Sequence, residues 1–202
     1  MKKTLDASKL LQGEIWVAKE IRERLGWPIT EDKVTEVLGL DIKRQVLGAR
    51  IEAQLCPASS ATNFNGQIII NSMYEEDSVF DYMHEVVHYI HDVGVGNKVD
   101  HNFTRKHENN RIDETERQID FLTAVSLIPI DELAKDIDYY NKHWYILNEA
   151  RYTRKLLQKY KCSKECLMQR YSEVHTVRRI LKNSNLSSFS SISLQTALDS
   201  LN

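Results

Sequence analysis

The sequence contains little cysteine, glycine or proline, and each scarcity excludes a class of structure. Three cysteines among 202 residues cannot form a disulfide framework, and an odd number of thiols suits a reducing compartment. Seven glycines and three prolines leave few points at which a helix must end, so long helices are expected. No apolar run approaches the ~18–20 residues that a membrane-spanning helix needs. We therefore expect a protein without membrane segments.

An excess of charge of one sign is also missing. The chain has 27 basic and 29 acidic residues and a formal net charge of −2, so no overall positive field would attract nucleic acid. Its first residues, MKKTLDASKLLQGEIW, carry acidic and amide side chains where a secretory signal has an apolar run. With 42% hydrophobic and 28% charged residues, the composition is that of a globular protein. These properties predict a cytoplasmic enzyme or regulator and do not separate the two.

The periodicity of apolar residues predicts an α+β fold that is predominantly helical and has a small twisted β-sheet. A spacing near 3.6 residues predicts helices over residues 10–25, 30–39, 77–92, 113–128, 131–140, 144–160 and 163–182. Alternation of apolar and polar residues, or a run of isoleucines, predicts strands at residues 49–55 and 67–71. The helix over 77–92 is expected to pack on this sheet, and the polar segment 97–111 is expected to be a loop.

The same pattern suggests four regions along the chain. These are an N-terminal helical arm (1–45), a core (46–130), a C-terminal helical region (131–182) and a serine-rich tail (183–202). For the tail we expect poor order or a weak terminal helix over 193–201.

The helix expected over 77–92 contains the motif H-E-x-x-H, which reads His84-Glu85-Val86-Val87-His88. Residues i and i+4 lie on one helix face, one turn apart, so both imidazoles can reach a single tetrahedral ion. Glu85 lies beside that pair, where its carboxylate can take a proton from a water on the metal and later give it to a leaving amine. The motif therefore predicts a Zn²⁺ site with Glu85 as general base and acid. Two histidines on a solvated helix surface are the alternative.

A zinc site of this kind needs a third protein ligand, and the next predicted helix offers Glu116. Asp120 follows four residues later on the same face, where it could accept a hydrogen bond from the outer nitrogen of a ligating histidine. Glu114 competes for the metal but lies off the face of Asp120. We therefore expect His84, His88 and Glu116 to hold the metal, with Asp120 supporting one histidine.

Three stretches of the sequence together resemble the ImmA/IrrE family of bacterial metallopeptidases. They are the strand Ile68–Asn71, the segment Phe80–Ile90 with its F-x-x-x-H-E-x-x-H pattern, and the segment from Glu116 to Pro129. The family's later helix reads approximately E-x-x-A-(N/D)-x-F-A-A-x-L-L-x-P, and aligning it on its closing proline places Glu116 at the third zinc ligand and Asp120 at the Asn/Asp position. The resemblance covers about residues 45–130. This sequence departs from the pattern at Ile119, Phe121 and Ser126.

The resemblance implies more than the residues alone would. It implies a gluzincin-like fold and a zinc-dependent endopeptidase with a protein substrate. Because several members encoded on mobile elements and prophages cleave a helix-turn-helix repressor, a DNA-binding repressor is the expected target, and its cleavage would derepress genes. The alternatives are a non-proteolytic module that sequesters a repressor while keeping the zinc-site architecture, and a zinc hydrolase acting on a non-peptide amide. Neither the oligomeric state nor the activation signal is predicted.

Other residues leave alternatives open. The donor that would stabilise an oxyanion could be Tyr82, Tyr89 or a histidine of the loop that contains His101 and His107. His91 could be an extra ligand or a solvated residue at the helix end. The strand Ile68–Asn71 is expected to be able to pair with an extended substrate.

The C-terminal helices raise the question of a partner. The locally basic segment 156–179 predicts a helix, a short turn and a second helix that Ser163 caps. Packing on the catalytic domain or docking of a protein partner fits this pair better than direct nucleic-acid binding, because acidic residues dilute its basic face.

Overall fold

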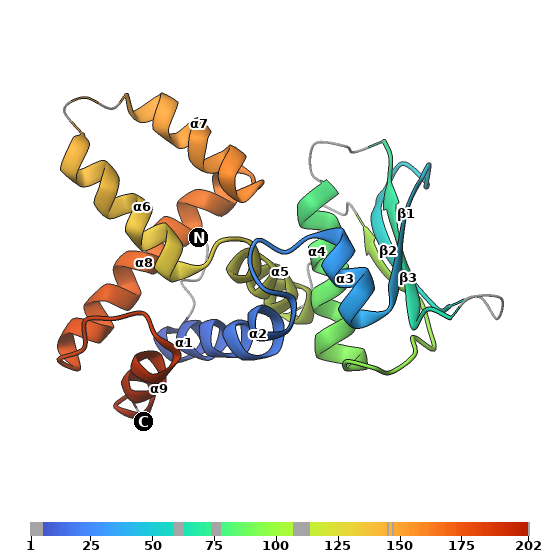
Figure 1. Cartoon of the computed structure of the whole chain (residues 1–202), viewed down its shortest axis with the longest axis horizontal. Coiled ribbons are helices and arrows are strands. Elements are labelled where there is room, and N and C mark those ends of the chain that lie inside the picture. Colours follow the sequence, from blue (N-terminus) through green and yellow to red (C-terminus); the bar gives the residue numbers. More distant parts are fainter. Residues whose placement is uncertain are drawn as a thin grey trace. The chain divides into compact units, whose positions relative to one another are not determined.

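The computed structural model describes residues 6–58, 63–73, 78–106, 114–144, 146 and 148–201. Its helices and small sheet form a predominantly helical α+β fold, as the sequence predicts (Figure 1). The chain divides into two compact units, one made of residues 20–123 and the other of residues 1–19 together with 124–202. The first unit contains the sheet. The second groups the start of the chain with the C-terminal helices, because helix α1 (Ala7–Trp16) packs against helices α8 (Lys164–Asn183) and α9 (Ser191–Asp199).

Within the described residues, the strands of the first unit form one mixed four-stranded sheet in the order β1-β3-β2-β4. Its strands are β1 (Leu40–Gln45), β2 (Ile51–Cys56), β3 (Gly66–Asn71) and β4 (Phe103–Lys106). Strand β3 runs parallel to β1 and antiparallel to β2, and β4 is antiparallel to β2. The isoleucines of β3 suit this central place, since Ile68 and Ile70 are completely or almost completely buried.

The sheet order corrects two expectations. Strand β3 was expected to pair with an extended substrate, but neighbours occupy both of its edges, and the edge strands are β1 and β4. The segment 97–111 was expected to be a loop, yet residues 103–106 form β4 through antiparallel pairing with β2. Four residues with a single aromatic side chain give no periodic signal, so only the distant partner strand makes this segment a strand.

Helix α4 (Ser78–His88) lies at the centre of the first unit and contacts β2, β3 and β4. Every residue from Asp81 to Ile90 is buried. The π-helical turn η3 (Tyr89–Val93) continues the helix, and the N–H of Gly94 donates to the carbonyl of Tyr89 at 2.8 Å. Gly94 adopts φ 89°, a left-handed conformation that glycine tolerates, and the helix ends there.

The N-terminal helices follow their predicted signals. The helix expected over 10–25 is continuous but mixed, since α1 passes into the π-helical segment η1 (Val17–Arg22) and then α2 (Glu23–Leu25). Helix α3 (Glu31–Leu38) begins at the N-cap Thr30, whose hydroxyl accepts from the N–H of Lys33 at 3.4 Å. It ends at Gly39, which has φ 66°.

The second unit is built around α8 in the residues described. Helix α5 (Glu114–Leu127) crosses the boundary between the units, and helices α6 (Ile130–His143), α7 (Glu149–Tyr160), α8 and α9 follow it. Ser163 caps α8 as predicted, since its hydroxyl accepts from the N–H of Cys166 at 3.1 Å. The serine-rich tail forms α9, because Ser190 caps it and Leu194, Ala197 and Leu198 bury one face.

A buried ion network lies inside this second unit. The Arg170 guanidinium, which is completely buried, pairs with Glu14 of α1 and with Glu173 of its own helix, each at 2.5 Å. It also donates from two nitrogens to the carbonyl of Ile128, at 3.0 and 3.2 Å. The Arg170 side chain thus joins two distant segments, α1 and the residue that follows α5, to helix α8.

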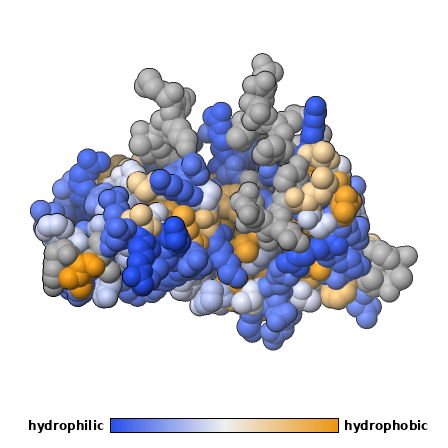
Figure 2. Space-filling view, turned by 90° about the horizontal axis from the view of Figure 1, so that it is seen from above, coloured by the Kyte–Doolittle hydropathy of each residue, from blue (hydrophilic) through white to orange (hydrophobic). Residues whose placement is uncertain are grey.

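In the face shown in Figure 2, the apolar atoms occupy small separate areas among hydrophilic ones. The most exposed large apolar residues include Val46, Trp144, Ile146 and Ile192, whose exposed fractions range from 67% to 81%. Among the helices that the structure describes, none has the length and apolar character that crossing a membrane requires.

Candidate metal centre

The two histidines of the H-E-x-x-H motif lie on one face of helix α4. His84 is 1% exposed and His88 is 4% exposed, and their ring centroids are 4.8 Å apart. Buried imidazoles need polar partners, because an unpaired polar group costs free energy in a low-dielectric interior. Each ring has such partners on both of its nitrogens.

The Nε2 atoms of both histidines face the carboxylate of Glu116 on helix α5. His84 Nε2 lies 3.2 Å from Glu116 Oε2, and His88 Nε2 lies 3.3 Å from Glu116 Oε1. In the part of the chain that the structure describes, these three residues are the one group of His, Cys, Asp or Glu side chains close enough to hold a metal ion. The competing carboxylate Glu114 is exposed and outside the group.

The ligand atoms lie close enough together for one cation to gather them. Ligand atoms bound at 2.0–2.1 Å with tetrahedral angles lie about 3.3 Å from one another. Each histidine Nε2 is about this far from one oxygen of Glu116, at 3.2 and 3.3 Å, and the three ligand atoms as a set lie within 4.8 Å of one another. The Glu116 side chain is 41% exposed, whereas those of His84 and His88 are almost fully covered, so the group is open on its Glu116 side. The donor set, two imidazoles and one carboxylate, is one that binds Zn²⁺.

His88 and Glu116 shift each other's pKa in the direction that favours the charged forms. Burial acts to lower the pKa of His88, but hydrogen bonds to Glu116 and Asp92 outweigh it and raise this pKa to about 9. Hydrogen bonds from His84 and His88 hold the pKa of Glu116 far below its usual range. A site that concentrates negative charge against two imidazoles favours a cation, because a metal ion replaces the protons that hold the group together.

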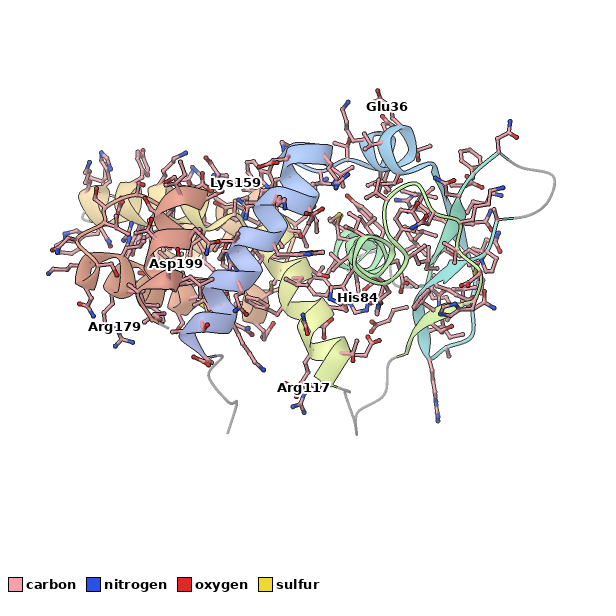
Figure 3. The ribbon with its side chains drawn as sticks, turned by 90° about the horizontal axis from the view of Figure 1, so that it is seen from below. Glu36, His84, Arg117, Lys159, Arg179 and Asp199 are labelled. Carbon is pink, nitrogen blue, oxygen red and sulfur yellow. The ribbon has the colours of Figure 1, made fainter. Side chains whose placement is uncertain are left out.

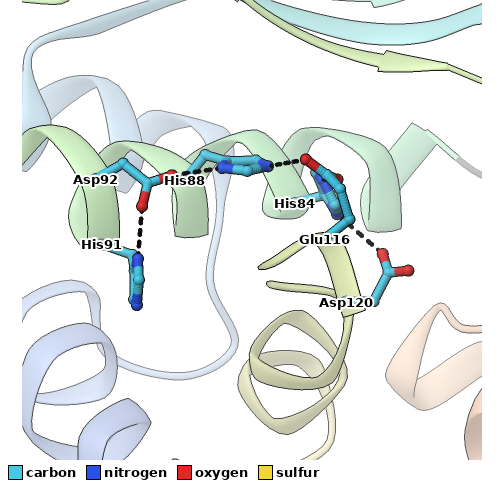
Figure 4. A network of polar contacts seen from close by, with 6 residues as sticks. All are labelled: His84, His88, His91, Asp92, Glu116 and Asp120. Carbon is cyan, nitrogen blue, oxygen red and sulfur yellow. Dashed lines mark hydrogen bonds and ion pairs between the residues drawn. The ribbon is translucent and has the colours of Figure 1, made fainter. Parts of the chain in front are cut away.

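The Nδ1 atoms of the same histidines are bound by aspartates (Figure 4). His84 Nδ1 donates to Asp120 Oδ1 at 3.0 Å, so the structure brings together all four residues that the sequence assigned to the metal and its support. His88 Nδ1 donates to Asp92 Oδ2 at 2.7 Å. Sequence reasoning missed Asp92, although an acidic residue four positions after the second histidine is a signal that could have found it.

The charged residues of helix α5 lie on different faces of the helix. Figure 3 shows His84 inside the first unit, whereas Arg117, which follows Glu116, points away from it. The positions of Glu116 and Asp120, four residues apart, put both carboxylates on the helix face that meets α4. The buried residues Ile119 and Leu122 hold the neighbouring part of the helix in the core.

Glu85 lies beside the ligands on helix α4 and is completely buried. Its charge is among the influences that raise the pKa of His88. Burial, and secondarily the charge of Glu85, also raise the pKa of the half-buried thiol of Cys56 at the end of β2. The charge of Glu85 thus acts both on His88 and on the last residue of β2.

The two tyrosines that could stabilise an oxyanion already donate their hydroxyl groups to backbone carbonyls. Tyr82 donates its hydroxyl to the carbonyl of Ile29 at 3.2 Å, and burial raises its pKa to about 12. Tyr89 donates to the carbonyl of Asn97 at 2.8 Å and is completely buried. Both hydroxyls thus donate to backbone carbonyls within the first unit. His107 lies outside the described residues.

A row of aromatic rings connects the metal group to edge strand β4. The ring of Phe103 stacks on His88 with centroids 5.5 Å apart, and the ring of His101 lies 4.4 Å from that of Phe103. The His101 side chain is 65% exposed, and its Nδ1 donates to Asp100 at 2.5 Å. His101 therefore lies near the metal group through Phe103 and is open to solvent.

Comparison with known proteins adds no family assignment. A scan against protein-family models finds no match to the chain, and a search of curated proteins finds none either.

Proposed function

We propose that the protein is a zinc-dependent endopeptidase of the ImmA/IrrE type. The observation that carries the proposal is the convergence of two imidazole nitrogens of one helix on both oxygens of a carboxylate from another helix. Two histidines on a solvated surface would not be buried or face a shared carboxylate, whereas His84 and His88 are buried and do. The resemblance to the ImmA/IrrE metallopeptidases supports peptide as the substrate class.

In this proposal His84, His88 and Glu116 hold Zn²⁺, and the remaining residues handle protons and substrate. A zinc ion held there acts as a Lewis acid that polarises a carbonyl oxygen and lowers the pKa of water. Glu85 accepts the proton of the attacking water on a carboxylate oxygen as the carbon–oxygen bond forms. It then delivers that proton to the nitrogen of the leaving amine as the carbon–nitrogen bond breaks. Asp120 and Asp92 keep the two imidazoles in place.

An extended peptide would bind along strand β4. This strand is at the edge of the sheet, and its Phe103 contacts the ring of His88. Edge strands present unpaired backbone groups that can form main-chain hydrogen bonds to an added strand. A peptide paired with β4 would pass beside the proposed metal ligands. Strand β3 has no free edge for such pairing, because it lies between β1 and β2.

The target follows from the resemblance. Several ImmA/IrrE proteins encoded on mobile elements and prophages cleave a helix-turn-helix repressor and so release transcription. We propose the same role here, with a DNA-binding repressor as the substrate and the reducing cytoplasm as the compartment. The three free cysteines suit that compartment.

The test compares the wild-type protein with Glu85→Gln. Both are loaded with Zn²⁺ and incubated with the repressor encoded beside the gene, and with a peptide library, and fragments are detected by mass spectrometry. We expect the wild type to cut and Glu85→Gln to bind one zinc ion per chain but to cut about 10²–10⁴-fold more slowly. Metal content is measured in the same samples.

Other outcomes assign the function differently. If both proteins bind the repressor equally and no fragment appears, the protein is a sequestering module. Hydrolysis of small amides without cleavage of any peptide would make it a zinc amidohydrolase. A wild-type protein that takes up no zinc would remove the basis of the proposal.

A further inference from the structure

The carboxylate of Asp92 binds two imidazoles at once. Its Oδ2 accepts from His88 Nδ1 at 2.7 Å, and its Oδ1 accepts from His91 Nδ1 at 2.6 Å (Figure 4). The Asp92 side chain is 24% exposed and that of His91 is 32% exposed, whereas the side chain of His88 is 6% exposed. The contact thus extends from a buried ring, through a half-buried carboxylate, to a ring that solvent reaches.

These residues come from a single stretch of helix. His88 ends α4, and His91 and Asp92 lie in the π-helical turn η3 that follows directly. Asp92, four residues after His88, lies on the same side of the helix. π-Helical turns occur frequently at functional sites. By contrast, the partner of His84 Nδ1 is Asp120, which another helix supplies.

We propose that Asp92 is a positioning residue of the metal centre, an inference that rests on the zinc site of the proposed function. By accepting the Nδ1 proton of His88, Asp92 fixes the tautomer whose Nε2 lone pair points to the cation, and it holds the ring in that orientation. His91 contributes indirectly, because its Nδ1–H binds the second oxygen of Asp92 and keeps the carboxylate from turning away. His91 is therefore neither an extra ligand nor simply a solvated side chain.

The two ligating histidines consequently differ in how they are prepared for the metal. The orientation of His84 depends on Asp120 and so on the docking of helix α5. The Nδ1 partner of His88 comes from its own helix, although its Nε2 also faces Glu116 of α5. The hydrogen bond that sets the His88 tautomer therefore does not depend on the docking of α5.

The experiment measures Zn²⁺ affinity by competition with a chromogenic chelator at fixed pH. It compares the wild type with Asp92→Ala, Asp92→Asn and the control Asp100→Asn. Asp100 is a matched control because it also accepts from an imidazole Nδ1, that of His101, which lies outside the metal group. We expect Asp92→Ala to weaken zinc binding about 10–100-fold. Asp92→Asn should fall in between, since its amide oxygen still accepts, and Asp100→Asn should stay within twofold of the wild type.

A second readout separates orientation of the ring from support of the fold. In ¹⁵N spectra of the zinc-loaded protein, the Nδ1–H signal of His88 should move in both Asp92 variants and stay in place in Asp100→Asn. His91→Ala should weaken zinc binding in the same direction but by less than Asp92→Ala. If Asp92→Ala does not fold, the isosteric Asp92→Asn still decides the question.

Two results would overturn the inference, and they can be told apart. If the wild type binds zinc and both Asp92 variants bind it within twofold of the wild type, Asp92 does not position His88, and the proposed function stands. If the wild type itself binds no zinc, both the inference and the proposed function fail.

Discussion

At the scale of single residues, the buried side chain of Asn71 holds together the backbone around two strands of the first unit. Asn71, the last residue of β3, is completely buried. Its amide nitrogen donates to the carbonyls of Ile51 and Gly48, at 2.7 and 3.3 Å. Its oxygen accepts from the backbone N–H groups of Leu47 and Met73, at 3.2 and 3.1 Å. One side chain therefore satisfies the backbone of the segments that precede β2 and follow β3.

Replacing Asn71 by alanine should destabilise the protein markedly. The substitution removes the partners of two carbonyls and two N–H groups at a buried position, and we expect the free energy of unfolding to fall by about 2–4 kcal/mol. Urea denaturation measures this change. Gln54→Ala, which removes one side-chain hydrogen bond to Thr104, is the control and should change stability by about 0.5 kcal/mol or less. Equal losses in the two variants would contradict the role given to Asn71.

Zinc binding should depend on pH through His88. The pKa of His88 in the metal-free protein is about 9, above its ordinary 6.5, so the ring carries a proton at neutral pH. A cation must displace that proton, so zinc affinity should rise with pH until about pH 9 and then level off. Calorimetry near pH 7.5 in two buffers with different heats of ionisation measures the proton released. Binding without proton release would show that His88 is neutral before the metal arrives.

At the scale of elements, Arg170 determines how the helices of the second unit are fixed. The side chain is completely buried on α8, and its partners come from α1, from α8 itself and from the carbonyl of Ile128 just after α5. Buried ion networks contribute little net stability compared with apolar packing, but removing one member leaves the others with uncompensated charge.

Arg170→Ala should therefore be severely destabilising. We expect the free energy of unfolding to fall by about 3–5 kcal/mol, since Glu14 and Glu173 would lose the cation that they share. Arg24→Ala is the matched control, because Arg24 forms an exposed pair with Glu20 on one helix, for which a loss of about 0.3–0.5 kcal/mol is expected. Thermal and urea unfolding measure both variants. A loss below about 1 kcal/mol in Arg170→Ala would show that the network relaxes around the gap.

The helices could be predicted from the sequence better than the strands. Caps such as Thr30 and Ser163 are local signals. The two histidines of the metal group were also predictable, because their i, i+4 spacing depends on one helix alone. The third member of the group comes from a second helix, and the structure places Glu116, which the spacing indicated, beside the two histidines. Strands β1 and β4 were missed because neither has a strong alternation of apolar and polar residues. Pairing with strands that are distant in the sequence makes these segments strands.

At the scale of the whole molecule, the metal should contribute to stability. The candidate ligands His84, His88 and Glu116 all lie in the first unit, on helices α4 and α5, so a bound cation would join these two helices. A ligand that binds the folded state more tightly than the unfolded chain stabilises the folded state by mass action. At free zinc 100 times the dissociation constant, we expect the free energy of unfolding to rise by about 2.7 kcal/mol. Differential scanning calorimetry with zinc, and again after a chelator, measures this effect. His88→Ala should abolish the response, and a response that persists in that variant would place the metal elsewhere.

The adjacency of His84 and His88 on one turn has a consequence for the denatured chain. Any transient helix formed over that turn recreates two of the three ligands before tertiary structure exists. Denatured molecules should therefore retain weak zinc affinity. The gain in stability on adding zinc should then reach a plateau, whose height is set by the ratio of the dissociation constants of the unfolded and folded chains.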